Sequence, residues 1–430
     1  MPRVTGLRDS GHKRTSSRVG KRFRKRPERV PRRLGFRCDQ NHNLPWRAAQ
    51  LPYHFPTTIY RMPCSLRAQD AETQRADFLS LKPRDFDQRP LLVIWEMTQA
   101  CDLKCAHCRA NSRPHRHPLE LSTAEAFHLI DQVAAMKVPL FVLTGGDPLK
   151  RPDLLPIVEY ACRRQVRTSL TPSTTPLLVR DAIFKLKESG LMRLAVSLDG
   201  STPELHDGFR GVPGSYQRTI DAVGWCHEAG LPVQVNTTVS HRNVDDLDNM
   251  IKLLVDLRVV LWSVFFLVPT GRAQLKDLLT AEEHERVFAK LYETSKRVKF
   301  HIKSTEGQHY RRYVLQQRAH DPNARSEEDL IAGAPRGVND GKGFVFVSHT
   351  GEVYPSGFLP LRAGNILWEP LSEIYQNSPL FRSLRDRTQL KGKCGRCEFN
   401  EVCGGSRARA YALSHDPLAE EPCCAYLPQG

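Results

Sequence analysis

The sequence predicts an α/β fold built on a parallel sheet. Between Leu91 and Val298, six short apolar stretches alternate with six amphipathic ones, and this alternation is typical of successive strand–helix units. The apolar stretches are so uniform that we expect strands buried on both faces. The pattern alone fits a curled partial barrel and an open doubly wound sheet equally well. In both arrangements functional groups gather at the carboxyl ends of the strands.

The elements follow from periodicity and from the residues that start and stop helices. The first unit has a strand at Leu91–Thr98 and a helix over 121–138 whose start Ser122 caps. Gly190 and Gly230 close two later helices, as glycine commonly does after a last helical turn. The other strands are expected at 139–148 (with its closing turn), 166–173, 191–200, 231–239 and 261–271, and the other helices at 153–164, 176–190, 215–230, 244–257 and 281–298.

Composition divides the 430 residues into four expected segments. They are a basic extension over 1–88, a strand–helix core over 89–308, a polar linker over 309–343 and a small cysteine-rich domain over 344–430, which starts with a hairpin. The net charge of +16 is concentrated in the run His12–Arg37. We interpret this run as a solvated tail, and the alternative is an arm for nucleic acid or another acidic partner.

The sequence predicts a cytoplasmic protein. No run of eighteen apolar residues suggests a membrane span, and the N-terminus lacks the apolar stretch of a signal peptide. In that compartment the 12 cysteines are expected to be thiols, metal ligands or catalytic groups rather than disulfides.

Three cysteines crowd into the stretch QACDLKCAHCRA directly after the first strand. Cysteine thiolates are the usual ligands of iron–sulfur clusters. A cubane has four irons, so Cys101, Cys105 and Cys108 would leave one iron without a protein ligand. Such an open position invites a substrate or cofactor, as it does in catalytic zinc sites. His107 is either a fourth ligand or, as we expect, a residue that packs over the cluster.

The spacing C-x3-C-x2-C after a first strand, followed by TGGDP after the second, resembles the radical S-adenosylmethionine (SAM) enzymes. The resemblance covers about 91–298. It implies a partial (β/α)6 barrel of the TIM type and a [4Fe–4S] cluster whose open iron binds the methionyl group of SAM. It also implies reductive cleavage of SAM to a 5′-deoxyadenosyl radical, which abstracts hydrogen from a substrate.

The resemblance also suggests residues that bind SAM. The TGGDP motif corresponds to a family motif that contacts the methionyl amino group, with Asp147 where glutamate is commoner. Residues after strands three to six match positions that often line the ribose and carboxylate pockets, although each alone would more often be a turn residue. The predicted set is Gly145, Gly146, Asp147, Pro148, Ser173, Ser197, Asp199, Asn236 and Arg272.

A second group of cysteines lies near the C-terminus. Its spacing suits a zinc knuckle, and it resembles the SPASM extension of many radical SAM enzymes, which binds auxiliary [4Fe–4S] clusters. Because Ser356 stands where a cysteine commonly sits in that extension, we expect one auxiliary cluster rather than two. Its expected ligands are Cys394, Cys397, Cys403 and Cys424, with Cys423 as the alternative to the last.

The C-terminal stretches are most similar to enzymes of haem and haem d1 biosynthesis. That likeness implies oxidative decarboxylation of a tetrapyrrole propionate. Arg407 and Arg409 would suit propionate carboxylates, and the alternative is that they simply pack and pair on a surface. A maturase that modifies a ribosomal peptide is the second reading, and a non-catalytic metal-binding scaffold is the third. The expected partners are the tetrapyrrole or peptide and a low-potential donor such as ferredoxin or flavodoxin, with no membrane or nucleic acid.

Overall fold

The fold is built on one ten-stranded sheet in which eight strands are parallel. The computed structural model describes residues 86–320 and 337–429, all within the unit Arg61–Gly430, so the expected basic extension lies outside the described residues except for its last three. The strand order is β10-β9-β8-β1-β2-β3-β4-β5-β6-β7, parallel except where β9 pairs with β8 and β10. The strands are β1 Leu92–Glu96, β2 Leu140–Thr144, β3 Thr168–Leu170, β4 Arg193–Ser197, β5 Val233–Val239, β6 Leu261–Phe266, β7 His301–Thr305, β8 Phe344–Val347, β9 Glu352–Tyr354 and β10 Gly364–Asn365.

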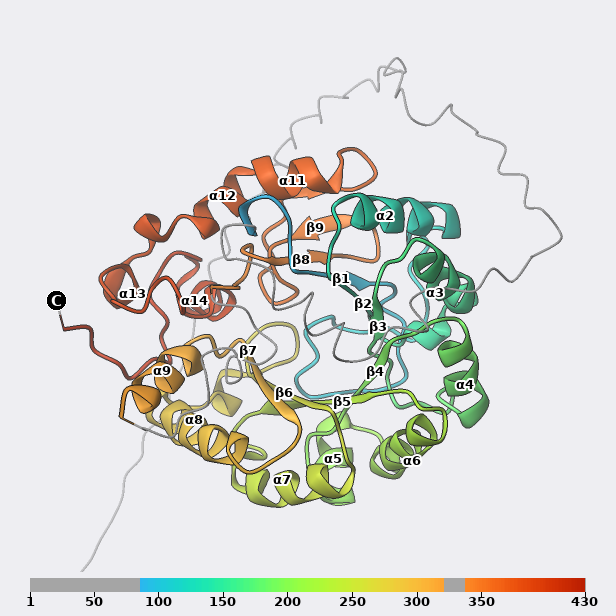
Figure 1. Cartoon of the computed structure of the whole chain (residues 1–430), viewed down its shortest axis with the longest axis horizontal. Coiled ribbons are helices and arrows are strands. Elements are labelled where there is room, and N and C mark those ends of the chain that lie inside the picture. Colours follow the sequence, from blue (N-terminus) through green and yellow to red (C-terminus); the bar gives the residue numbers. More distant parts are fainter. Residues whose placement is uncertain (1–85, 321–336, 430) are drawn as a thin grey trace, which may run out of the picture. The chain divides into compact units, whose positions relative to one another are not determined.

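The helices line the outer side of this curved sheet (Figure 1). Those of the strand–helix series are α2 Thr123–Ala135, α3 Leu154–Arg163, α4 Arg180–Glu188, α5 Pro203–Arg210, α6 Ser215–Glu228, α7 Leu247–Asp256 and α8 Ala281–Ser295. They are followed by α9 Tyr310–His320, α11 Leu371–Asn377, α12 Pro379–Arg385, α13 Gly392–Gly395 and α14 Arg407–Ser414. The α/β class and the six predicted strand–helix units are confirmed. Helix α9 occupies the start of the stretch expected to be a linker.

Local signals in the sequence explain where helices begin and end. Ser122 accepts a hydrogen bond from the backbone of Glu125, whose side chain accepts one from the backbone of Ser122, so the predicted cap is a full capping box. Gly190 and Gly230 follow their helices with positive φ angles of 97° and 61°, as the prediction required. These caps fix the lengths of the helices between the strands.

Side chains alternate between the two faces of the sheet. In β5, Val233, Val235 and Val239 are buried, while Gln234 and Asn236 between them are only half-buried. The valines join one apolar core with Trp95, Phe141 and Trp262 from other strands, against the helices. The prediction that the strands are buried on both faces is therefore wrong for β5, because the inner face of a partly closed barrel holds polar side chains.

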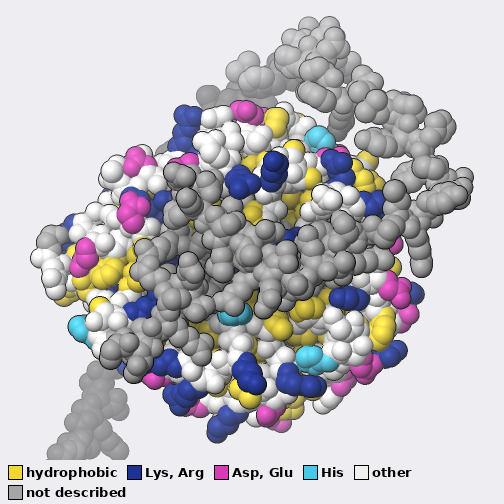
Figure 2. All heavy atoms as spheres, viewed as in Figure 1, with side chains coloured by type: hydrophobic (Ala, Val, Ile, Leu, Met, Phe, Trp, Pro, Cys, Tyr) yellow, Lys and Arg dark blue, Asp and Glu magenta, His cyan; other side chains and the backbone are white. Residues whose placement is uncertain are grey.

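One strand, one strand pairing and one disulfide were not predicted from the sequence. Strand β7 adds a seventh parallel strand after β6, and the predicted hairpin strand β8 pairs in parallel with β1, which extends the sheet beyond the six units. The expectation of no disulfides is wrong at Cys162, which is disulfide-bonded. No helix within the described ranges is long and apolar enough to cross a membrane. Basic and acidic side chains intersperse around the rim in Figure 2.

Tyr375 joins the start of the described chain to the start of β8. Its buried hydroxyl donates to the carbonyl of Phe86 and accepts from the backbone N–H of Gly343. We expect Tyr375→Phe to lower the free energy of unfolding by about 1–2 kcal/mol, because a buried donor and acceptor lose their partner. Urea unfolding of wild type and variant measures this.

Tyr354→Phe is the matched control. Its hydroxyl bonds only Glu352 in a half-buried position, so its loss is expected to cost less than about 0.5 kcal/mol. Equal unfolding midpoints for the two variants would contradict the role given to Tyr375.

Candidate functional site

The loop after β1 places the three predicted thiols together at the carboxyl end of the sheet. Cys101 and Cys105 are buried and pack with the half-buried Cys108 in one small cluster, and all three are free thiols. Backbone hydrogen bonds close the base of the loop: Cys101 N–H donates to the carbonyl of Arg113 at 2.8 Å, and Arg113 N–H donates to that of Gln99 at 2.9 Å. The loop is therefore a fixed platform for the thiols.

Two neighbouring turns hold this loop by close backbone contact. The N–H of Gly146 donates to the carbonyl of Thr98 at 2.7 Å, and a Cβ atom on Gly145 or Gly146 would meet carbonyl oxygens of the loop at 2.5 or 2.4 Å. On the other side a Cβ on Gly271 would lie 2.3 Å from the carbonyl oxygen of Cys108. Only glycine permits these approaches.

Arginine side chains surround the thiols. Arg210, at the end of α5, donates to the sulfur of Cys105 at 3.6 Å and forms a buried ion pair with Asp199. Burial opposes the charge of Arg210, but the Asp199 carboxylate holds the pKa of Arg210 above its usual value. Arg272 donates to the carbonyl of Cys105 at 2.9 Å. These positive charges stabilise thiolates in a site where burial raises the pKa of Cys101.

The predicted SAM residues divide into two groups. Ser173 lies at the thiol loop, where its hydroxyl is 3.3 Å from the sulfur of Cys101 and donates to the carbonyl of Gly146 at 2.7 Å. Ser197 and Asn236 are register partners on β4 and β5 and face the inner side of the sheet. The geometry brings Ser173 to the cysteines, and leaves Ser197 and Asn236 further along the inner face.

Asp147 and Asp199 are turned into the protein. Asp147 is fully buried, and its carboxylate accepts from the hydroxyl of Thr175 at 2.7 Å and from the N–H of Leu149 at 3.1 Å, while Pro148 opens the short helix η3 Pro148–Lys150. Burial raises the pKa of Asp147 to about 6. Asp199 accepts from the N–H of Thr238 in addition to pairing with Arg210. Both carboxylates brace loops of the site.

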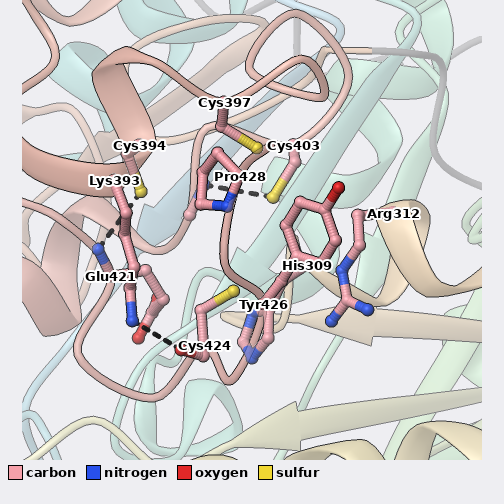
Figure 3. A pocket seen from close by; sticks show the side chains of 11 residues that line it. His309, Arg312, Lys393, Cys394, Cys397, Cys403, Glu421, Cys424, Tyr426 and Pro428 are labelled. Carbon is pink, nitrogen blue, oxygen red and sulfur yellow. Dashed lines mark hydrogen bonds between the residues drawn. The ribbon is translucent and has the colours of Figure 1, made fainter. Parts of the chain in front are cut away.

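The second cysteine group surrounds one pocket, which Figure 3 shows from close by. Cys394, Cys397, Cys403 and Cys424 all line it, with His309, Arg312 and Tyr426 among the other lining residues. Cys423 does not line this pocket; its thiol donates to the carbonyl of Leu279. Across the described ranges, no three His, Cys, Asp or Glu side chains are arranged to hold a single metal ion.

Comparison with known proteins identifies the family. The model of the radical SAM superfamily matches residues 95–254. The AdoMet-dependent heme synthase of Methanosarcina barkeri is 43% identical over 346 residues, which cover 79% of this chain and 97% of the relative. The chain belongs to the radical SAM superfamily.

Two further relatives of this radical SAM enzyme are informative. The PqqA peptide cyclase of Rhodopseudomonas palustris is 27% identical over 364 residues, covering 79% of this chain and 88% of the relative. The crystal structure of Streptococcus suis SuiB bound to S-adenosylmethionine has a TM-score of 0.62 at 17% identity and covers 79% of this chain and 78% of that one. The latter shows a shared fold.

Membership implies a [4Fe–4S] cluster and SAM, and the thiol loop fits the cluster. The donor set is three free thiols beside cationic Arg210 and Arg272. His107 packs its ring against Phe209, with centroids 4.5 Å apart, and burial lowers its pKa well below the usual value. This packing agrees with the interpretation of His107 as a residue that covers the site.

Sequence reasoning missed Arg210 and misjudged two other arginines. Helix α5, which presents Arg210, could have been found from the Thr202 cap with Pro203 at the start and from Gly211 at the end. Arg407 and Arg409 are fully buried: Arg407 donates to carbonyls of the C-terminal segment, and Arg409 pairs with Glu421. The prediction that they bind propionates is wrong, because their donors are already used inside the protein.

Gly271→Ala tests the close contact with the thiol loop. Gly271 has a φ of 62°, and the added Cβ would collide with backbone atoms of Cys108 and Arg109. We expect the loop to shift at a cost on the order of 1–3 kcal/mol and the variant to retain less iron at the three thiols. Iron per chain after anaerobic reconstitution, together with the EPR change on adding SAM, measures this.

Gly224→Ala is the control, because a Cβ there meets no atom within 4 Å and alanine is favoured inside helix α6. It should retain wild-type iron. A Gly271→Ala variant with the same iron content and the same EPR response as Gly224→Ala would show that the contact does not hold the loop.

Proposed function

We propose that this enzyme uses SAM to decarboxylate propionate side chains of an iron tetrapyrrole oxidatively. The observation that carries the proposal is the 43% identity to AdoMet-dependent heme synthase across 97% of that relative. The similarity to PqqA peptide cyclase is lower, at 27%. Each reacting propionate would lose one hydrogen atom, one electron and CO₂, and become a vinyl group.

In this proposal the loop after β1 provides the reactive centre. Cys101, Cys105 and Cys108 would hold three irons of the cluster, which together with bound SAM supplies a 5′-deoxyadenosyl radical able to take a hydrogen atom. Arg210 stabilises the thiolate of Cys105 from the buried side of the loop. Ser173, within 3.3 Å of the sulfur of Cys101, would orient the nearest part of SAM.

The remaining predicted SAM residues would act along the inner face of the sheet. Ser197 and Asn236 offer a hydroxyl and an amide, which suit the hydroxyls of a ribose. Arg272 keeps its Cys105 contact through Nε, and its Nη2 lies 3.4 Å from the hydroxyl of Ser112. Gly145 and Gly146 present half-exposed backbone beside the thiols, where a methionyl ammonium would find carbonyl oxygens.

One auxiliary [4Fe–4S] cluster at the C-terminal pocket would accept the electron that decarboxylation releases. Four thiols line that pocket, and full ligation by protein suits electron transfer rather than binding of substrate. The N–H groups of Glu421 and Gly405 donate to the sulfurs of Cys394 and Cys403, at 3.2 and 3.4 Å. Such hydrogen bonds to sulfur help set the potential of a cluster. The first electron would come from a ferredoxin or flavodoxin.

The proposed domain division keeps the radical SAM core at 89–308 and a SPASM-like domain at 344–430. Strand β8, at the start of the second segment, pairs with β1 of the first, so the two segments would share one sheet. This pairing would join the segment that bears the thiol loop to the start of the SPASM-like segment.

The proposed function is tested with the reconstituted full chain, dithionite, SAM and iron-coproporphyrin III. Mass spectrometry should detect products that have lost one and then two formic acid equivalents (CO₂ and two hydrogens), together with 5′-deoxyadenosine. Cys105→Ala should abolish both products, while Cys226→Ala, a buried cysteine in α6, should leave both.

Two other results would replace the proposal. Modification of a peptide encoded beside the gene, with no change to the porphyrin, would favour the peptide maturase. Absence of 5′-deoxyadenosine with every substrate, from protein that holds its iron, would favour the non-catalytic scaffold.

Cys424 and Cys423 can be separated as auxiliary ligands. Because Cys424 lines the pocket and Cys423 contacts Leu279, Cys424→Ala is expected to lower the iron of the auxiliary site and Cys423→Ala to leave it near the wild-type value. Iron and sulfide are counted in a background without Cys101, Cys105 and Cys108. Loss of iron in Cys423→Ala alone would reverse the assignment.

A further inference from the structure

Lys303 stands on the inner face of the sheet, in the middle of β7. Its neighbour Ile302 belongs to the apolar core, and successive side chains of a strand point to opposite faces. Thr305 is two residues further along the strand and on the same face as Lys303. Its hydroxyl oxygen lies 3.3 Å from the hydroxyl oxygen of Ser263 on β6. Lys303 is therefore on the side where the site lies.

A single row of register partners crosses this inner face. Ser197 pairs with Asn236, Asn236 with Ser263, and Ser263 with Lys303. Neighbouring strands are about 4.8 Å apart, so the backbone of Lys303 lies about 10 Å from that of Asn236. The row thus runs from Ser197 and Asn236, two predicted SAM residues, to the ammonium group of Lys303 on β7.

Lys303 is part of a cationic group without a carboxylate partner in the described ranges. Arg193, at the start of β4, also faces inward, because Leu194 beside it is in the core. Burial lowers the pKa of Lys303 to about 8, helped by the charges of Arg311 and Arg193, so these cations are near one another. Within the described residues, neither Lys303 nor Arg193 forms a salt bridge or a side-chain hydrogen bond. Arg311 donates its hydrogen bonds to two backbone carbonyls.

Desolvated cations are costly without a counter-charge. Two buried arginines of the protein have such a partner: Arg210 pairs with Asp199, and Arg409 pairs with Glu421. Among the described residues no carboxylate pairs with the half-buried Lys303 or Arg193, so a bound anion suits this part of the inner face. In the strand order Lys303 lies two strands beyond Asn236, so a ligand at Lys303 would lie beside the residues proposed for SAM.

We propose that Lys303, supported by Arg193, binds a propionate carboxylate of the tetrapyrrole substrate and so positions it beside SAM. The inference rests on the proposed function and adds a specificity-determining residue to it. An ammonium is suited to a carboxylate as a point charge with three donors, and a charge-assisted hydrogen bond of this kind is among the strong ones.

Binding titrations of the reconstituted full chain test the proposal without turnover. The probes are iron-coproporphyrin III and its tetramethyl ester, which has no carboxylates, followed by absorbance in the presence of SAM. Wild type should bind the acid more tightly than the ester. Lys303→Met should weaken binding of the acid on the order of 10-fold or more and leave binding of the ester unchanged. Lys303→Arg should restore most of the affinity.

The control is Lys252→Met, an exposed lysine on α7, which should bind both probes as wild type does. SAM affinity and the EPR change on SAM binding should be unaltered in Lys303→Met. Equal affinity of wild type for acid and ester, or equal losses for both probes in Lys303→Met, would overturn the assignment.

A loss of SAM binding in Lys303→Met would show that the lysine serves the carboxylate of SAM instead, and would also overturn it. Failure of the proposed function looks different: wild type would neither bind nor convert iron-coproporphyrin III, and this inference would fall with it. If wild type converts the porphyrin but binds acid and ester alike, the function stands and the role of Lys303 does not.

Discussion

The close backbone contact between the thiol loop and its two neighbouring turns is the constraint on which the site depends. Hydrogen bonds hold a loop after β1 against the turn after β2, and Gly271 after β6 meets it from the other side. The turn after β2 lies next to this loop because β2 pairs with β1, whereas the segment after β6 reaches it because the sheet curves. The curvature therefore has a chemical consequence, since it fixes three thiols in one place before any metal arrives.

Charge is arranged to suit thiolates at that place. A buried ion pair alone adds little to stability, because desolvation offsets the attraction. The pair of Arg210 and Asp199 has a second task, since Arg210 also reaches the sulfur of Cys105. The backbone of α5 supports the same loop, because the carbonyls of Phe209 and Arg210 accept from Ala106 and Lys104. One short helix thus supplies both position and charge.

The sequence was informative wherever a residue has a local cause. The capping box at Ser122, the helix-closing Gly190 and the three-cysteine loop depend on neighbours within a few residues, and each could be predicted. The pairing of β8 with β1 could not, because it joins segments some 250 residues apart. The roles of Arg407 and Arg409 could not be predicted for the same reason. Only the fold shows that their guanidinium groups donate to Glu421 and to backbone carbonyls and are not free to bind a substrate.

The hydrogen bonds around Ser356 agree with the expectation of one auxiliary cluster rather than two. Ser356 stands where the SPASM pattern commonly has a cysteine, and the hydroxyls of Ser356 and Ser406 both donate to the buried carboxyl group of Glu306. Burial and the neighbouring Asp340 raise the pKa of Glu306 well above its usual value. Oxygen groups hydrogen-bonded to one another occupy this region, where a cluster would need thiolates and space. The thiols that line the C-terminal pocket are therefore the donor set proposed for an auxiliary centre.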